Sequence, residues 1–149
     1  MIEGVLIEER KIFPNEKGNV LHMLRSDAPF FKKFGEIYFS VCLPGAVKGW
    51  KKHLRQTQHF AVPFGELKLV LFDDRPDSST REQVQEIHIG ENQYRLVRIP
   101  YGVWYSFSAV GKEKALIANC TDMPHESEES ISRKLDDKTM PAVWEEQKA

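Results

Sequence analysis

The sequence predicts an all-β protein. Most of the chain divides into short runs of β-forming residues, and Gly, Pro, Asn and Asp recur between these runs as they do in tight turns. Within residues 84–89, polar and apolar side chains alternate from Glu86 onward, and no segment carries the sustained 3.6-residue periodicity of an amphipathic helix. About eight or nine such strands in one chain indicate either a β-sandwich or a double-sheet jelly roll.

Length and composition indicate one domain and exclude several classes of partner. The 149 residues are enough to bury a core, and the chain has neither an internal repeat nor a linker, so we expect a single domain over residues 1–149. The net charge of −1 gives no general attraction to nucleic acid or anionic lipid. No apolar run approaches the roughly 18 residues of a membrane helix, and the N-terminus does not resemble a signal peptide. We therefore expect a cytoplasmic protein that binds neither nucleic acid nor a membrane.

The N-terminal part is expected to supply three strands. Residues 5–12 and 20–24 are rich in β-formers, and the polar turn at 14–19 separates them. Residues 28–34 are aromatic and suit either a short helix or an irregular cover. Residues 36–43 are again rich in β-formers and predict a third strand.

The rest of the chain is organised around residues 45–75, which predict three short strands. Pro44-Gly45 makes the entry turn and residues 63–65 make a second one. The apolar run at 69–72 is typical of a strand that is buried on both faces, and residues 73–77 close the unit as a polar turn.

The C-terminal half predicts further strands and then a tail of different character. Residues 126–135 are charged and suit a short helix or a solvated loop, so we expect an irregular or helical tail. Residues 141–144 form an apolar patch that docks on the body or on a partner subunit. The expected strands before the tail are residues 84–89, 94–99, 103–110 and 115–120.

The two cysteines, Cys42 and Cys120, are flanked by apolar or small residues. The pair could form a disulfide, but in a reducing compartment we expect two buried thiols that pack as small hydrophobic groups. The chain has no C-x-x-C motif, which leaves a cysteine-based zinc site without support.

One strand face of the central stretch suggests a binding site. Lys51 and His53 are two residues apart, so on a strand they point to the same face, whereas Trp50 points to the opposite one. This face is either a solvent-exposed basic surface or the lining of a pocket.

Six stretches of the sequence, taken together, carry a family resemblance. In their order and spacing, over about residues 18–144, the chain resembles the cupin barrel and, within it, the dTDP-4-dehydrorhamnose 3,5-epimerase family. The resemblance implies a double-sheet jelly-roll barrel, usually a homodimer that exchanges strands, with a nucleotide-sugar substrate inside the barrel mouth. The matching stretches are residues 34–40, 43–50, 68–80, 95–107, 118–125 and 135–141.

The positions that hold metal in metallo-cupins are occupied here by Lys51, His53, Gln58 and Tyr105. A protonated lysine has no lone pair, and a glutamine amide is a weak neutral ligand, so this set does not suit a first-row metal. The resembled epimerases are also metal-free. We therefore expect no metal and no other cofactor.

The resemblance also implies catalytic roles. The family's histidine base falls on Lys51, and His53 offers a substitute base from the same face. The supporting aspartate of the family corresponds to Asp137, or to Asp136 if the register slips. A lysine acts as a base only when its pKa is lowered by several units, so the choice between Lys51 and His53 stays open.

The other half of the acid–base set is altered as well. The family's tyrosine acid falls near Ile117, which cannot donate a proton, and this leaves Tyr105 as the candidate acid. The family's oxyanion lysine falls on Gln58, which can still donate a neutral hydrogen bond to an enolate oxygen.

Basic residues are expected to bind the diphosphate of the substrate. The family positions correspond to Lys48 and Lys17, and Arg25 and Arg75 are additional candidates. Lysine binds phosphate as a point charge, without the bidentate geometry of arginine. The alternative is that these residues are ordinary surface charges.

These observations predict a sugar-nucleotide epimerase or isomerase that acts on a 4-keto nucleotide sugar in surface polysaccharide biosynthesis. The reaction is proton transfer through an enolate, with Lys51 or His53 as base. The alternative is a catalytically diverged cupin that binds a sugar or a nucleotide sugar without turnover.

Overall fold

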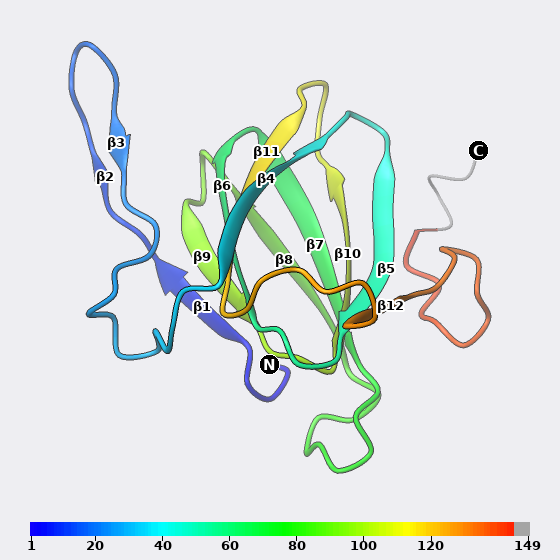
Figure 1. Ribbon diagram of the computed structural model, residues 1–149. Helices are drawn as coiled ribbons and strands as arrows, with labels where there is room; N and C mark the ends of the chain where they lie inside the picture. The colour runs from blue at the N-terminus through cyan, green and yellow to red at the C-terminus, as the bar shows by residue number, and fades with distance from the viewer. Residues whose placement is uncertain (145–149) are drawn as a thin grey trace.

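The computed structural model describes residues 1–144 as two antiparallel sheets that face each other, with a separate hairpin (Figure 1). One five-stranded sheet has the order β1-β9-β6-β11-β4, and the other has the order β12-β5-β10-β7-β8. The strands are β1 (Leu6–Glu9), β2 (Ile12–Phe13), β3 (Val20–Leu21), β4 (Glu36–Cys42), β5 (Val47–His53), β6 (Gln58–Phe64), β7 (Glu66–Asp73), β8 (Val84–Gly90), β9 (Arg95–Ile99), β10 (Val103–Ala109), β11 (Ala115–Thr121) and β12 (Ser130–Ser132).

This arrangement confirms the predicted all-β, double-sheet jelly-roll fold. Residues 1–144 contain no α-helix, and within them no helix could span a membrane. The helical alternative for residues 126–135 is wrong, because β12 lies inside this charged segment and pairs antiparallel with β5. The pairing satisfies backbone groups that β5 would otherwise leave exposed at the edge of its sheet.

The N-terminal segment differs from its expected form. The predicted strand at residues 5–12 is divided into β1, which pairs with β9, and β2, which pairs with β3. The chain leaves the barrel between these strands, and the β2–β3 hairpin projects from the body at the upper left of Figure 1. Residues 28–34 form an irregular cover rather than a helix.

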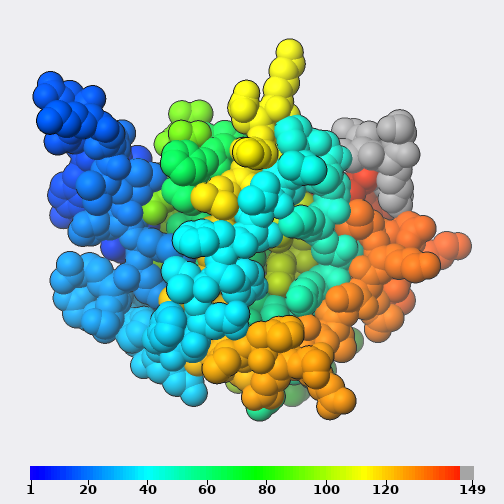
Figure 2. Space-filling model, turned by 45° about the horizontal axis from the view of Figure 1, so that its top comes forward, coloured from blue at the N-terminus to red at the C-terminus, as the bar shows by residue number. Residues whose placement is uncertain are grey.

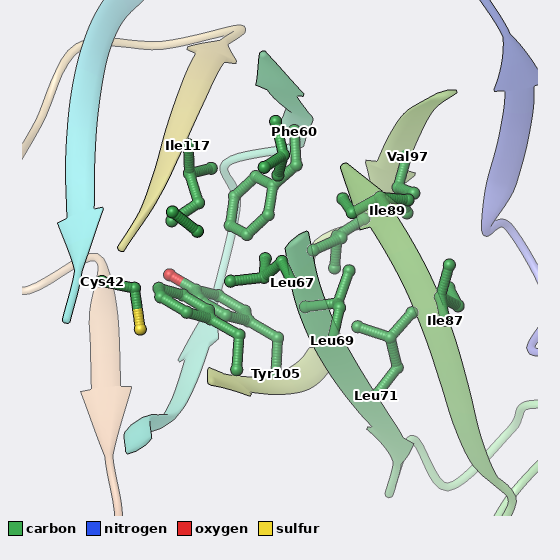
Figure 3. Packing of buried hydrophobic residues seen from close by; sticks show 14 of the residues in the cluster. Cys42, Phe60, Leu67, Leu69, Leu71, Ile87, Ile89, Val97, Tyr105 and Ile117 are labelled. Carbon is green, nitrogen blue, oxygen red and sulfur yellow. The ribbon is translucent and has the colours of Figure 1, made fainter. Parts of the chain in front are cut away.

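The main core fills the space between the sheets. Leu67, Leu69 and Leu71 on alternate positions of β7 are fully buried, and they pack with side chains that include Phe60 and Tyr105 (Figure 3). A second apolar cluster lies on the outer face of the same sheet, where Val70 is also buried. Strand β7 is therefore covered on both faces, as its apolar run predicted.

The C-terminal tail supplies part of the second cluster. Trp144 packs with Trp50 and Trp104, and its indole Nε1 donates a hydrogen bond to Ser106 Oγ at 2.8 Å. The apolar patch at residues 141–144 thus docks on the body of its own chain. The expectation of two buried, unbridged thiols is also confirmed.

Candidate active site

A cavity of about 290 Å³ opens between β4 and β5, at the side where the two sheets separate. Figure 2 shows the surface hollowed between the cyan β4 segment and the turquoise β5 segment. Phe60, Phe107 and Ile117 supply apolar wall. The polar side chains that line the cavity are Tyr38, Ser40, Lys48, Lys51, Tyr105, Asn119 and Ser132.

An irregularity in β5 directs two lysines into this cavity. The pairing of β5 with β10 shifts register, so that Lys51 lies opposite Tyr105 and Lys48 lies opposite Phe107. Regular alternation would put lysines three residues apart on opposite faces of the strand. At the shift, Gly49 has a φ of 127°, and a Cβ there would lie 2.6 Å from Ser106 Cβ, so only glycine fits.

The two neighbouring lysines of β5 have different environments. Lys52 forms an ion pair with Asp74 at 2.9 Å and lies over the Trp104 ring. Lys51 lines the cavity and has no hydrogen-bonding or ionic partner within residues 1–144. Its ammonium group is therefore available to a ligand.

Behind the cavity, three buried side chains form a hydrogen-bonded chain. Glu129 Oε2 lies 2.6 Å from His53 Nδ1, and His53 Nε2 lies 3.1 Å from the Tyr105 hydroxyl. The Tyr105 ring lines the cavity, so this series of hydrogen bonds begins at the cavity wall and continues into the interior through His53 to Glu129. Glu129 Oε1 also accepts the backbone N–H groups of Arg55 and Gln56, which fixes the carboxylate.

The charges along this chain follow from burial and hydrogen bonding. Burial would raise the pKa of Glu129, but hydrogen bonds from His53 and from two backbone N–H groups outweigh it and lower the pKa. Burial lowers the pKa of His53, against the opposing effect of Glu129. Burial raises the pKa of Tyr105 far above its ordinary value, and a hydrogen bond from Gln58 opposes this rise.

These protonation states fix the direction of the hydrogen bonds. An ionised Glu129 accepts the Nδ1 proton of a neutral His53, so Nε2 accepts the Tyr105 hydroxyl proton. The Tyr105 oxygen accepts the hydrogen bond from Gln58 with one lone pair and keeps the other. Such a chain can accept a proton at Tyr105 while the phenol proton moves to His53, and Glu129 stabilises the resulting imidazolium.

The opposite wall carries a second polar cluster. Asn119 Nδ2 donates to the Tyr38 hydroxyl at 2.8 Å and also to Gln58 Oε1. Gln58 is fully buried and lies behind the cavity rather than in its lining. Burial raises the pKa of Tyr38, and the hydrogen bond from Asn119 opposes this rise.

The structure brings only some of the predicted site residues together. Lys48, Lys51 and Tyr105 line the cavity, and His53 and Gln58 lie directly behind it. The remaining four predicted residues lie elsewhere: Lys17 in the turn of the β2–β3 hairpin, Arg25 paired with Asp27, Arg75 paired with Asp73, and Asp137 bonded to Thr139 and Arg133 in the tail.

Three functional candidates were missed in the sequence. Tyr38 and Asn119 alternate with outward-facing residues in β4 and β11, so strand periodicity could have identified their inward face. Glu129 lies in a run of charged and small residues, and nothing in its spacing distinguishes it from Glu126 or Glu128.

Two relatives align with most of the chain. The probable low-salt glycan biosynthesis epimerase Agl13 of Haloferax volcanii is 32% identical over 120 residues, which cover 79% of this chain and 77% of Agl13. The spore coat polysaccharide biosynthesis protein SpsL of Bacillus subtilis is 27% identical over 146 residues, which cover 97% of each chain.

A solved structure and a family profile agree with these relatives. The crystal structure of a dTDP sugar isomerase from Desulfovibrio desulfuricans superposes with a TM-score of 0.94 at 48% identity, over 97% of this chain and 92% of that one. The profile described as dTDP-4-dehydrorhamnose 3,5-epimerase matches residues 1–149. The chain belongs to the dTDP-4-dehydrorhamnose 3,5-epimerase family.

Proposed function

We propose that this protein epimerises a 4-keto nucleotide sugar by proton transfer through an enolate, as a step in the synthesis of a surface polysaccharide. The observation that carries the proposal is the cavity in which Tyr105, backed by His53 and Glu129, lies beside Lys51, which has no ionic or hydrogen-bonding partner within residues 1–144. Family membership supports the reaction class, and the names of Agl13 and SpsL support the polysaccharide context.

The base, Tyr105, acts from the cavity wall that is formed by β5 and β10. The Tyr105 oxygen removes the proton next to the ketone while its own proton passes to His53 Nε2. Glu129 stabilises the imidazolium, which is the role that the family resemblance implied for Asp137. Lys51 stabilises the negative oxygen of the enolate, because a cation in a partly dehydrated site binds an enolate more tightly than a ketone. His53 thus acts through Tyr105, which serves on the base side rather than as the acid expected from the sequence. Lys51 acts as the electrostatic group rather than as the base.

The cavity size supports a substrate that is only partly enclosed. About 290 Å³ lies near the lower end of the ~300–1,000 Å³ typical of ligand pockets, so it suits a sugar ring rather than a whole nucleotide sugar. Lys48 lies at the exposed side of the cavity and donates to Ser40 Oγ at 3.2 Å and to the Val41 carbonyl at 2.8 Å. An ammonium has three donors, and the third has no partner among residues 1–144, so it can bind a phosphate oxygen.

A cytoplasmic homodimer is part of the proposal. Phe13 and Val20 are exposed on the projecting β2–β3 hairpin, which suits contact with a second copy of the chain. Such a contact would carry Lys17 away from its own barrel and toward a partner. The two unbridged buried thiols fit a reducing compartment. Sedimentation equilibrium tests the assembly, and a monomer at micromolar concentration contradicts this part.

Incubation with a dTDP-linked 4-keto-6-deoxy sugar in heavy water tests the function. We expect deuterium at a ring carbon next to the ketone, together with an epimerised product, both followed by NMR. Absence of deuterium at every ring carbon contradicts the proposal. If calorimetry then detects binding of the same compound, the protein is the non-catalytic binder that the sequence left as an alternative.

A further inference from the structure

Inversion at a carbon requires a base on one face of the sugar ring and a proton donor on the other. The proposed base-side groups, Tyr105 with His53 and Lys51 beside them, all belong to the sheet that contains β5 and β10. The facing wall belongs to the other sheet, and its polar side chains in the cavity are Tyr38, Ser40 and Asn119. A ring held between the two sheets presents its second face to these three residues.

Of these three, only Tyr38 is suited to give up a proton. A phenol has an ordinary pKa near 10, whereas an amide and an aliphatic hydroxyl are far weaker acids. The Ser40 hydroxyl oxygen also accepts a hydrogen bond from Lys48, and Asn119 uses its amide N–H groups on Tyr38 and Gln58. We propose that Tyr38 is the proton donor on the ring face opposite Tyr105. This inference rests on the proposed epimerase function.

The surroundings of Tyr38 orient its proton toward the cavity. Its oxygen accepts the Asn119 Nδ2 hydrogen at 2.8 Å, and its own O–H donates to no residue within 1–144. Asn119 is itself held at both ends, because its Oδ1 accepts the backbone N–H of His59 at 3.3 Å. The hydroxyl is therefore positioned by a buried amide, and its donor is left for a ligand.

The two tyrosines differ in the way that the two roles require. Tyr38 is 37% exposed and Tyr105 is 6% exposed, so Tyr38 can regain a proton from water after each turnover. Burial raises the pKa of Tyr38, which keeps the phenol protonated near neutral pH, while the Asn119 hydrogen bond stabilises the phenolate once the proton has left. Charged and titratable groups around Tyr38 come from several elements: Glu36 on β4, Lys48 and Lys51 on β5, Tyr105 on β10 and Glu129 before β12.

The proton balance of the step is complete. Tyr105 takes the proton next to the ketone as its own proton moves to His53, and the electrons of the broken C–H bond form the enolate. The Tyr38 O–H bond then breaks, its proton bonds to the same carbon from the opposite face, and the ketone re-forms. Water returns a proton to Tyr38, and the proton on His53 leaves through Tyr105. No oxidant or reductant is consumed.

The substitution Tyr38→Phe separates the two half-steps. In heavy water we expect the variant to lose inversion by about 100-fold or more, the usual loss for a general acid, while deuterium still enters the recovered starting sugar at the original configuration. Tyr101→Phe, which removes an exposed phenol outside this cavity, is the matched control and keeps the wild-type inversion rate. Calorimetry with dTDP verifies that both variants bind nucleotide.

The outcomes distinguish this inference from the proposed function. If the wild-type protein shows neither exchange nor inversion, the proposed function fails. If the wild type is active and Tyr38→Phe inverts at the wild-type rate, or loses exchange together with inversion, the assignment of Tyr38 is overturned.

A second measurement does not depend on removing the hydroxyl. Replacement of Tyr38 by 3-fluorotyrosine keeps the hydroxyl but makes the phenol more acidic. We expect the alkaline limb of the inversion rate to move to lower pH by about the difference between the two phenol pKa values. An unchanged alkaline limb overturns the assignment.

Discussion

Two buried carboxylates, Asp73 and Glu129, have similar electrostatics and different roles. Each has a lowered pKa despite its burial, because several hydrogen bonds favour the ionised form. Asp73 binds Arg75, Ser78 and Thr80, and this network continues to Glu3 at the surface, outside the cavity between β4 and β5. The hydrogen bonds of Glu129 lead through His53 to a phenol in the wall of a cavity. A perturbed pKa therefore identifies a satisfied buried charge, and what distinguishes Glu129 from Asp73 is its link to the cavity between the two sheets.

Removing the Tyr105 hydroxyl, which is where the Glu129 network meets the cavity, has the largest expected effect on kcat. Tyr105→Phe keeps the ring packing but removes the oxygen that takes the proton, so kcat should fall about 1,000-fold, or roughly 4 kcal/mol in activation free energy. Steady-state kinetics measure kcat, and thermal unfolding verifies that the fold is kept. A variant that retains more than a tenth of wild-type kcat would mean that the base lies elsewhere.

Breaking the Asp73 network should cost stability instead of rate. Asp73→Asn leaves Arg75 without its buried partner, so the free energy of unfolding should fall by about 3 kcal/mol while kcat and KM stay unchanged. The folded-state pKa of Asp73 is below the ordinary 3.8, so its contribution is complete above pH about 4 and is lost as pH falls through the folded-state pKa. Urea titrations at several pH values measure this, and loss of activity at full stability would contradict it.

Removing the charge of Glu129 should have a smaller effect with a characteristic pH signature. In Glu129→Gln the imidazolium loses its stabilising carboxylate, so kcat should fall about 10- to 100-fold. Glu129 opposes the lowering of the His53 pKa by burial, so without it that pKa falls further and the acidic limb of the rate moves to lower pH. A kcat that falls with no movement of the limb would indicate a purely structural role for Glu129.

The smallest expected effect concerns the two cations predicted to bind phosphate. Lys48→Met removes an ammonium whose third donor has no partner in the described part of the chain, so KM for the nucleotide sugar should rise about 5- to 10-fold with little change in stability. Arg75→Met is the matched comparison and should lower stability without changing KM, because its guanidinium is bonded to Asp73 and to the Glu3 carbonyl. If Arg75→Met raises KM as much as Lys48→Met does, the comparison fails.

Local sequence pattern predicted the parts of the site that depend on regular strands. Alternation correctly put Lys51 and His53 on one face of β5 and Trp50 on the other. Strict alternation would put Lys48 on the outer face of β5, away from the cavity. The structure puts it on the cavity face because Gly49 permits a register shift between β5 and β10. Whether an insertion of this kind occurs depends on how β10 pairs with its neighbour, which the residues of β5 alone do not determine.

The remaining errors concern partners that are distant in sequence. Glu129 reaches His53 across 76 residues of chain, and only the docking of β12 on β5 brings the two together. Arg75 was expected to bind phosphate, but Asp73 is two residues away and occupies its guanidinium. Charge and spacing identify which residues can form an ion pair, whereas tertiary packing determines which of them remain available to a ligand.

Strand β12 has only three residues and pairs with a single neighbour at the sheet edge, yet it follows directly after Glu129. Short edge segments open by local unfolding at a lower free energy than the strands of a barrel centre. Local unfolding of β12 would move the Glu129 carboxylate away from the His53 imidazole while the other strands of both sheets stay paired. Heat inactivation would then precede melting of the barrel, and amide hydrogen exchange at Ile131 would report the loss first.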